Sequence, residues 1–236
     1  MQLQLFPDPI LLLIRQGLTP LHGLLEGEER YQPTEQFVIS FIGSRTRDEV
    51  AADAFARLCA RFPRWEMMLS AKPAAITTLL GDVQYAPIKA EHLLATLHRL
   101  HGQRGTLDLG FLADWPVGIA WRWLQNLPGV GPKIAAATLN FSSLRKPIFV
   151  VDTHILRLAK RLGLLPAKAG FAHAHRLLNG LIPNDWTERD HYQLHWLMKS
   201  HGQKVCRHRV PLCSDCPLRN VCRHFTANGE QAMDKG

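Results

Sequence analysis

The sequence lacks any long hydrophobic run. The apolar stretch at residues 10–14 is short, follows Pro7 and Pro9, and has no basic leader before it. Such a stretch is typical of the inner face of a first helix, and it is too short for a membrane span or a signal peptide. We therefore expect a soluble, cytoplasmic protein with no membrane partner, in which cysteines stay reduced.

Strand-forming patterns are also scarce, because alternating β-branched runs are few and there is no internal repeat. Helical periodicity dominates and predicts an all-α fold, with helices over residues 36–42, 47–62, 86–101, 118–126, 131–142, 153–162, 172–181 and 186–201. The segment 144–147 is a candidate seam between two helical domains. Acidic residues are outnumbered, and the net charge of +8 favours a polyanionic partner, with nucleic acid as the first candidate.

Four of the five cysteines lie together near the C-terminus, with the spacing C-x6-C-x2-C-x5-C: Cys206, Cys213, Cys216 and Cys222. Thiolates are soft ligands that suit either an iron–sulfur cluster or a tetrahedral zinc ion. Zinc sites usually pair their ligands as two C-x2-C knuckles, whereas only one such pair is present here. The spacing therefore favours a cluster over the structural zinc alternative. Cys59 stands apart and is interpreted as a small buried hydrophobe.

A glycine turn precedes the predicted helix at residues 131–142, in the string L-P-G-V-G-P-K. Gly129, Val130 and Gly131 would let the backbone approach a phosphate closely, aided by the dipole of the following helix. Lys133 falls in the first helical turn, where the positive end of the dipole disfavours an ammonium. A neutral amine is the form needed for Schiff-base chemistry, although most lysines are only solvated surface charges.

Nineteen residues later, the string V-D-T-H-I places Asp152 immediately before a predicted helix. The simplest role of an aspartate at that position is to cap the helix. His154 is interpreted as packed or hydrogen-bonded rather than catalytic.

Taken together, these three motifs resemble those of the endonuclease III family of DNA glycosylases, over roughly residues 33–222. The resemblance implies an all-α fold of two helical domains with a DNA-binding cleft between them, a helix–hairpin–helix motif and a C-terminal iron–sulfur cluster loop. The domains it implies are residues 34–145, residues 1–33 with 146–225, and a disordered tail at 226–236. The implied cofactor is a [4Fe-4S] cluster, and the implied partner of a monomeric protein is double-stranded DNA with a damaged base or an abasic site.

The resemblance also implies roles for individual residues. Lys133 would attack C1′ of the damaged nucleotide, expel the base and form an imine, after which β-elimination nicks the strand. Asp152 would stabilise the cationic sugar and help deprotonate Lys133. The residues implied to contact DNA are Arg45, Arg47, Tyr85, Gly129, Val130, Gly131, Lys204, Arg207 and Arg209.

Two of these assignments have alternatives. Arg45 falls where many family members carry a glutamine that fills the gap left by the extruded base, and an arginine there could bind the orphaned partner base, especially guanine. It could instead pair with Asp48. Tyr85 falls where relatives place an apolar wedge, but it could equally be a buried tyrosine.

The resemblance predicts a bifunctional glycosylase and abasic-site lyase, and by analogy with the family its expected substrates are oxidised pyrimidines. One alternative is a monofunctional glycosylase of the same superfamily that excises uracil, mismatched thymine or adenine. Against the adenine type, Ser40 occupies the place of its catalytic glutamate. An alternative of another class is a non-catalytic iron–sulfur protein that binds DNA or senses redox state, which would need neither Lys133 nor Asp152.

Overall fold

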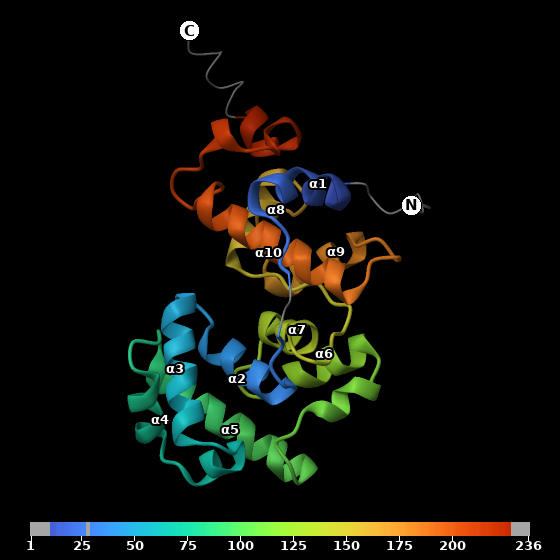
Figure 1. Ribbon diagram of the computed structural model, residues 1–236. Helices are drawn as coiled ribbons and strands as arrows, with labels where there is room; N and C mark the ends of the chain where they lie inside the picture. The colour runs from blue at the N-terminus through green and yellow to red at the C-terminus, as the bar shows by residue number, and fades with distance from the viewer. Residues whose placement is uncertain (1–9, 27–28, 228–236) are drawn as a thin grey trace. The chain divides into compact units, whose positions relative to one another are not determined.

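A computed structural model describes residues 10–26 and 29–227, and within those ranges it contains helices, turns and irregular segments but no strand. The prediction of an all-α fold is therefore confirmed (Figure 1). The chain divides into two compact units: unit 1 comprises Met1–Glu28 and Pro147–Gly236, and unit 2 comprises Glu29–Lys146. None of the helices in the described ranges combines the length and apolarity needed to cross a bilayer.

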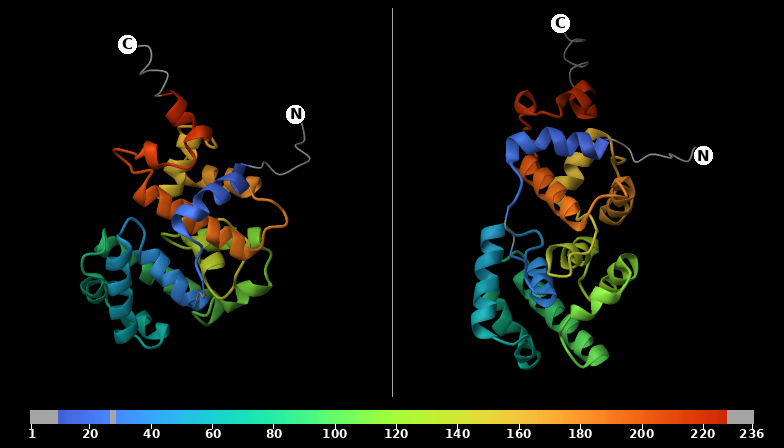
Figure 2. Two further views of the ribbon diagram at one scale, coloured as in Figure 1. Left: turned by 45° about the horizontal axis from the view of Figure 1, so that its top comes forward. Right: turned by 45° about the vertical axis from the view of Figure 1, so that its right-hand side comes forward.

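Unit 2 is built around its first helix, which packs against three others in the same unit (Figures 1 and 2). Its helices are α2 (Pro33–Ile42), α3 (Asp48–Arg61), α4 (Pro73–Leu80), α5 (Ala86–Arg104), α6 (Val117–Gln125) and α7 (Pro132–Phe141), with 3₁₀ turns η1 (Trp65–Ser70) and η2 (Gly110–Asp114). Helix α2 contacts α3, α5 and α7, and its side chains Phe37, Val38 and Ile42 have no exposed surface. This apolar helix is the centre of the core of unit 2.

Local sequence signals explain where these helices begin and end. Helices α2, α4 and α7 each have a proline in the first turn, where the missing N–H costs no hydrogen bond. Helix α5 ends at Gly105, which adopts the left-handed conformation (φ +71°) that terminates many helices. Helix α7 carries the small residues Ala135, Ala136 and Ala137, all fully buried, so that neighbouring helices can approach its backbone closely.

The described residues of unit 1 form long helices and short 3₁₀ turns, and a last helical stretch begins at Arg223. Before that stretch come α1 (Ile10–His22), α8 (Thr153–Leu162), α9 (Phe171–Leu181), α10 (Glu188–Lys204), η3 (Cys213–Asp215) and η4 (Arg219–Val221). Helix α10 packs against both α1 and α8, as the views in Figures 1 and 2 show. The contact with α8 is close at Gly202, where a Cβ atom would lie 2.8 Å from Cβ of His154.

Every helix predicted from periodicity is present, with ends that shift by a few residues. Helix α4 was not predicted, because it is short and rich in β-branched residues. Of the predicted tail at residues 226–236, residues 228–236 lie outside the described residues. Thr226 is still part of a helical turn, in which its backbone N–H donates to the carbonyl of Cys222 at 3.2 Å.

Candidate active site and cysteine pocket

The turn between α6 and α7 has the backbone geometry expected of the glycine string. Gly129 has a φ of +71°, and a Cβ there would lie only 2.9 Å from Cζ of Phe41 and 3.1 Å from Cβ of His92. Val130 is 7% exposed and therefore anchors the turn in the core. The hydroxyl of Thr96 donates to the carbonyl of Pro128 at 2.6 Å. Position 129 thus requires a glycine for two reasons: the backbone has a positive φ, and there is no room for a Cβ atom.

Gly131 differs from Gly129 in both respects. Its φ is −93°, and nothing lies within 4 Å of the place where its Cβ would be. It directly precedes α7, in which Pro132 and Lys133 form the first turn, and the indole of Trp121 donates to the carbonyl of Pro132 at 3.2 Å. The predicted position of Lys133 at the helix start is therefore confirmed, with its side chain half-buried.

Beside the turn, unit 2 has an open pocket of about 390 Å³, which we call the Arg45 pocket. Its lining residues are Phe41, Ser44, Arg45, Tyr85, Ile88, Lys89, His92, Gly129 and Ile134. Tyr85 is 52% exposed, so the alternative of a buried tyrosine is wrong. Arg47 is exposed at the N-cap of α3 and does not line the pocket. The volume and the mixture of apolar and cationic side chains suit a planar, polar ligand group.

Lys89 is the buried cation of this pocket. Burial, together with the positive charges of Lys133 and Arg45, lowers the pKa of Lys89 to about 8. Lys133 and Arg45 thus lie close enough to Lys89 for their charges to act on it. This part of unit 2 therefore concentrates positive charge close to Lys133.

In unit 1, the buried segment that leads to Asp152 is held by side chains. Residues 148–151 belong to no helix and lie in the core, where unpaired backbone groups would be costly. Asn179 bonds to both the N–H and the carbonyl of Phe149, at 2.8 and 3.1 Å. The N–H of Val151 donates to Nε2 of His175 at 3.1 Å. Nδ1 of His195 lies 2.8 Å from the carbonyl of Val150, which completes the support.

Asp152 caps α8, as the motif predicts. Its Oδ1 accepts hydrogen bonds from the backbone N–H groups of His154 and Ile155, both at 2.8 Å. Burial by itself raises the pKa of Asp152. His195 and the Ile155 hydrogen bond act in the opposite direction, and His154 and Lys199 add to them, so the pKa lies below its ordinary value. The lowered pKa favours the ionised carboxylate, which can stabilise a positive charge nearby.

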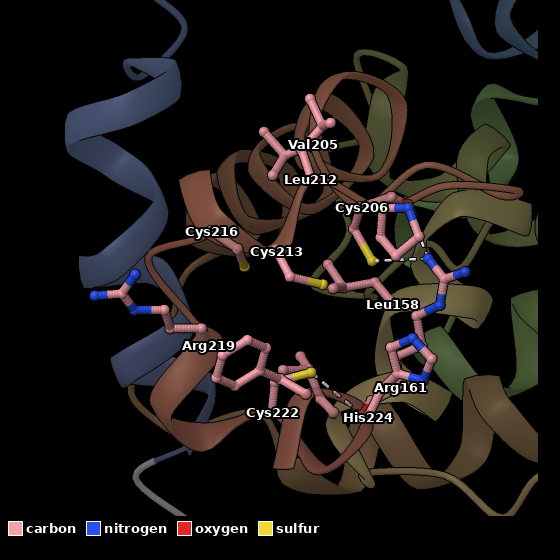
Figure 3. Close-up of a pocket in the computed structure, with 13 residues that line it drawn as sticks. Leu158, Arg161, Val205, Cys206, Leu212, Cys213, Cys216, Arg219, Cys222 and His224 are labelled. Carbon is pink, nitrogen blue, oxygen red and sulfur yellow. Dashed lines mark hydrogen bonds between the residues drawn. The ribbon is translucent and has the colours of Figure 1, made fainter. Parts of the chain in front are cut away.

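The four clustered cysteines line one pocket in unit 1 (Figure 3). Their sulfur atoms point toward the same central space in that view, between residues of α8 and the two 3₁₀ turns. Within the described residues, no group of three or more His, Cys, Asp or Glu side chains is placed to bind a single metal ion. Four thiols around one space are a ligand set that soft metal centres use, an iron–sulfur cluster or a zinc ion.

The surroundings of these sulfur atoms fit anionic ligands. Nη1 of Arg161 donates to Sγ of Cys206 at 3.2 Å, and Nε2 of His201 lies 3.3 Å from Sγ of Cys216. Burial and the neighbouring cysteines raise the pKa of the Cys213 thiol. A bound metal would reverse that preference by stabilising the thiolate. The residues present therefore fit a [4Fe-4S] cluster.

Cys59 is separate from this group. It lies on α3 in the other unit, is half-buried, and has a thiol whose pKa is raised by burial, then by Glu35. Cys59 is therefore less buried than the sequence predicts, although it lies outside the cysteine pocket.

The loop between Cys206 and Cys213 presents basic side chains. Arg207 and Arg209 are exposed in this loop, and Lys204, at the end of α10 just before it, is exposed as well. The backbone of this loop is fixed from inside, because Arg161 donates to the carbonyls of Arg207 and His208 at 2.6 and 3.0 Å. An exposed cationic loop on a fixed backbone is suited to phosphate contacts.

Sequence reasoning missed the residues that support the site, above all Lys89, His175, Asn179 and His195. The sequence does point to Lys89, because its helical spacing places it on the same face of α5 as the apolar residues Ala86, Ala90 and Leu93. No comparable signal identifies Asn179 or His175, because polar residues are common on the outer faces of helices.

Comparison with known proteins assigns the chain to a family. A family model described as "HhH-GPD superfamily base excision DNA repair protein" matches residues 38–184, and the chain belongs to this superfamily. It is 32% identical over 187 residues to an Arabidopsis thaliana protein named "Putative DNA glycosylase", covering 75% of this chain and 62% of the relative. It is 27% identical over 199 residues to endonuclease III of Thermotoga maritima, covering 84% of this chain and 86% of that protein. The resemblance to the endonuclease III family is thereby confirmed.

Some relatives are much longer than this chain. DEMETER-like protein 3 of Arabidopsis thaliana is 27% identical over 175 residues, which are 69% of this chain but only 17% of that protein. The chain thus spans about three fifths of one of these plant relatives and a far smaller part of the other.

Solved structures show the same fold. A trapped covalent intermediate of endonuclease III with DNA superposes with a TM-score of 0.76 and 19% identity, covering 96% of this chain and all of that one. A thermostable thymine-DNA glycosylase superposes with a TM-score of 0.70 and 16% identity, covering 92% of this chain and 95% of that one.

Proposed function

We propose that the protein is a DNA glycosylase that excises a damaged base and cleaves the resulting abasic site. The observation that carries this proposal is the position of Lys133, in the first turn of α7 directly after a glycine hairpin. An amine at that position lies beside backbone amides that suit a phosphate, and beside the cationic Arg45 pocket. A lysine nucleophile on a DNA-binding turn is the arrangement that Schiff-base chemistry requires.

In the proposed reaction, the neutral amine of Lys133 attacks C1′ of the damaged nucleotide, and the glycosidic bond breaks as the base leaves with its electron pair. The base gains a proton, and the sugar ring opens as the imine forms. Loss of a C2′ proton then expels the 3′ phosphate and leaves a nick. Asp152, held ionised by its surroundings, stabilises the cationic sugar and accepts the proton of the attacking amine. The proposal requires Lys133 and Asp152 to act on one nucleotide, and the predicted cleft between two domains stays a prediction.

The cysteine pocket has a structural role in this proposal. Cys206, Cys213, Cys216 and Cys222 would hold a [4Fe-4S] cluster, which supplies no step of the base-excision reaction. What the chain itself supplies there is a fixed loop that offers Arg207 and Arg209 to the DNA backbone. Because the net charge is +8, we expect DNA affinity to fall steeply as salt rises.

Borohydride trapping on a duplex with one abasic site tests the lyase activity. The wild type should form a covalent adduct, because borohydride reduces the imine, and Lys133→Ala should form none while still binding the duplex. Lys72→Ala is a matched control, since Lys72 is exposed and also lies next to a proline at a helix start. A wild type that binds the duplex but never crosslinks would exclude the lyase mechanism.

A screen of duplexes with single lesions tests the substrate. We expect excision of oxidised pyrimidines accompanied by strand cleavage. Removal of uracil or mismatched thymine without strand cleavage would instead support the alternative of a monofunctional glycosylase of the same superfamily.

A further inference from the structure

Lys89 makes an unusual set of contacts for a lysine. It is 7% exposed, and its ammonium donates to the carbonyl of Ile42 at 2.7 Å, the carbonyl of Ser44 at 2.5 Å and Oγ1 of Thr46 at 3.1 Å. An ammonium has three N–H groups and no acceptor, so the three donors match these three acceptors. Lys89 thereby fixes the turn at residues 42–46 from the inside.

Thr46 extends this network to a second segment. Its Oγ1 accepts a hydrogen bond from the backbone N–H of Gln84 at 3.2 Å and donates to the carbonyl of Ser44 at 3.3 Å. The hydroxyl therefore joins the turn before α3 to the turn before α5. We call Lys89, Thr46 and the groups they bind the Lys89 network.

Two residues with left-handed backbones flank the Lys89 network. Arg45 has a φ of 55° and Tyr85 a φ of 61°, and the only other non-glycine residue with positive φ in the described ranges is Arg145. Arg45 lies between Ser44 and Thr46, and Tyr85 follows Gln84. Strained conformations of this kind persist only where the surrounding structure holds them. Both side chains line the Arg45 pocket.

We propose that Lys89 is a positioning residue, which together with Thr46 holds Arg45 and Tyr85 at the pocket and thereby sets which base is accepted opposite the damaged nucleotide. This inference rests on the proposed function. The pocket offers a guanidinium and an aromatic ring, which suit hydrogen bonding and stacking with a base. Because guanine presents two adjacent acceptors to an arginine, it should be the preferred opposite base, by at least about fivefold.

Hydrogen exchange of the DNA-free protein tests the positioning role without any activity. Lys89→Met keeps the length of the side chain but removes its donors, so the amides of residues 43–46 and 84–86 should exchange faster. Lys146→Met is a matched control, because Lys146 also donates to two backbone carbonyls, of Ala113 and Trp115, but does not line the pocket. In that variant, only the amides of residues 113–115 should exchange faster.

Two results of this experiment would contradict the inference. One is unchanged exchange at residues 43–46 and 84–86 in Lys89→Met. The other is a uniform acceleration over unit 2, which would make Lys89 a general contributor to stability. If Lys89→Met does not fold, Thr46→Val gives the same test, since it removes the shared hydroxyl and leaves the lysine in place.

Nicking of abasic-site duplexes tests the consequence for specificity, using each of the four bases opposite the abasic site. The wild type should prefer guanine, Lys89→Met should lose most of that preference, and Lys89→Arg should restore part of it. Lys146→Met should keep it. Equal rates for all four bases in the wild type, or an unchanged preference in Lys89→Met, would overturn the inference while leaving the proposed function intact. A wild type that nicks none of the duplexes would contradict the proposed function, and the exchange experiment would still decide the positioning role.

Discussion

The glycine hairpin of unit 2 and the cysteine pocket of unit 1 are built on opposite principles. The hairpin is held by the chain alone: Gly129 packs against Phe41 and His92, Val130 is buried, and Thr96 bonds to the turn. The cysteine pocket has four thiols around a central space, and Arg161 donates a hydrogen bond to the sulfur atom of Cys206.

This difference has a physical consequence. A turn that is defined by packing and φ angles forms without any added group. Clustered thiols, by contrast, repel one another as thiolates and need a metal to neutralise their charge. The hairpin that carries Lys133 should therefore be independent of metal, whereas the loop assigned to DNA-backbone contacts should depend on it. Changes to the two regions can separate these properties.

The largest expected effect follows from removing one cluster ligand. Cys213→Ser should lose the bound iron, and the loop and adjoining turns over residues 205–225 should unfold locally, because the binding energy of the metal is part of their folding energy. Iron analysis and hydrogen exchange would measure both changes. The hairpin at residues 127–133 should exchange as in the wild type.

Cys59→Ser is the matched control for this change, since Cys59 lies on α3 outside the cysteine pocket. It should retain all of the iron. A Cys213→Ser protein with its full iron content, or a wild type that contains zinc and no iron, would contradict the assignment of the cluster.

The next largest effect concerns Asp152. Asp152→Asn should reduce single-turnover cleavage by about 10²- to 10⁴-fold, the usual range for a group that moves a proton in the transition state. Asparagine caps helices as well as aspartate does, so the free energy of unfolding should change little. Affinity for an abasic-site duplex should be kept. Full activity in this variant would show that Asp152 is only a helix cap.

A smaller effect, on stability alone, is expected at Gly129. An alanine there would be strained at φ +71° and would place its Cβ 2.9 Å from Phe41. Gly129→Ala should lower the free energy of unfolding of the protein by about 2–4 kcal/mol, measured by urea denaturation. A change within experimental error would mean that the hairpin is not held by packing.

The smallest change in stability is expected at Gly131. Gly131 has a φ of −93° and open space around it. The free energy of unfolding of Gly131→Ala should therefore lie within about 0.5 kcal/mol of the wild-type value. The added methyl group would nevertheless obstruct a phosphate that approaches the backbone, so the affinity for DNA should fall. Unchanged affinity, measured by fluorescence anisotropy at two salt concentrations, would argue against backbone contact at this glycine.

The sequence predicted the features that depend on local rules. Pro132 and Lys133 lie in the first turn of α7, and Asp152 caps α8, because caps and first turns are encoded by neighbouring residues. The cysteine spacing likewise predicted that four thiols would line one pocket.

Features that depend on tertiary contacts could not be predicted in the same way. The left-handed backbones of Arg45 and Tyr85 arise from the Lys89 network, whose partners are about forty residues apart in the sequence. The segment before Asp152 relies on Asn179 and His175, which approach it only in the folded unit. A lysine on the apolar face of α5 was the one visible sign of such contacts.

Peptide mapping of the borohydride-trapped adduct tests the central claim most directly. The wild-type protein, crosslinked to an abasic-site duplex, would be digested, and the modified lysine identified by mass spectrometry. Two other lysines serve as internal controls, because the charge of Lys133 acts on Lys89 and the charge of Lys199 acts on Asp152. The account predicts that the adduct is on Lys133 alone; an adduct on Lys89 or Lys199, or the absence of any adduct, would contradict it.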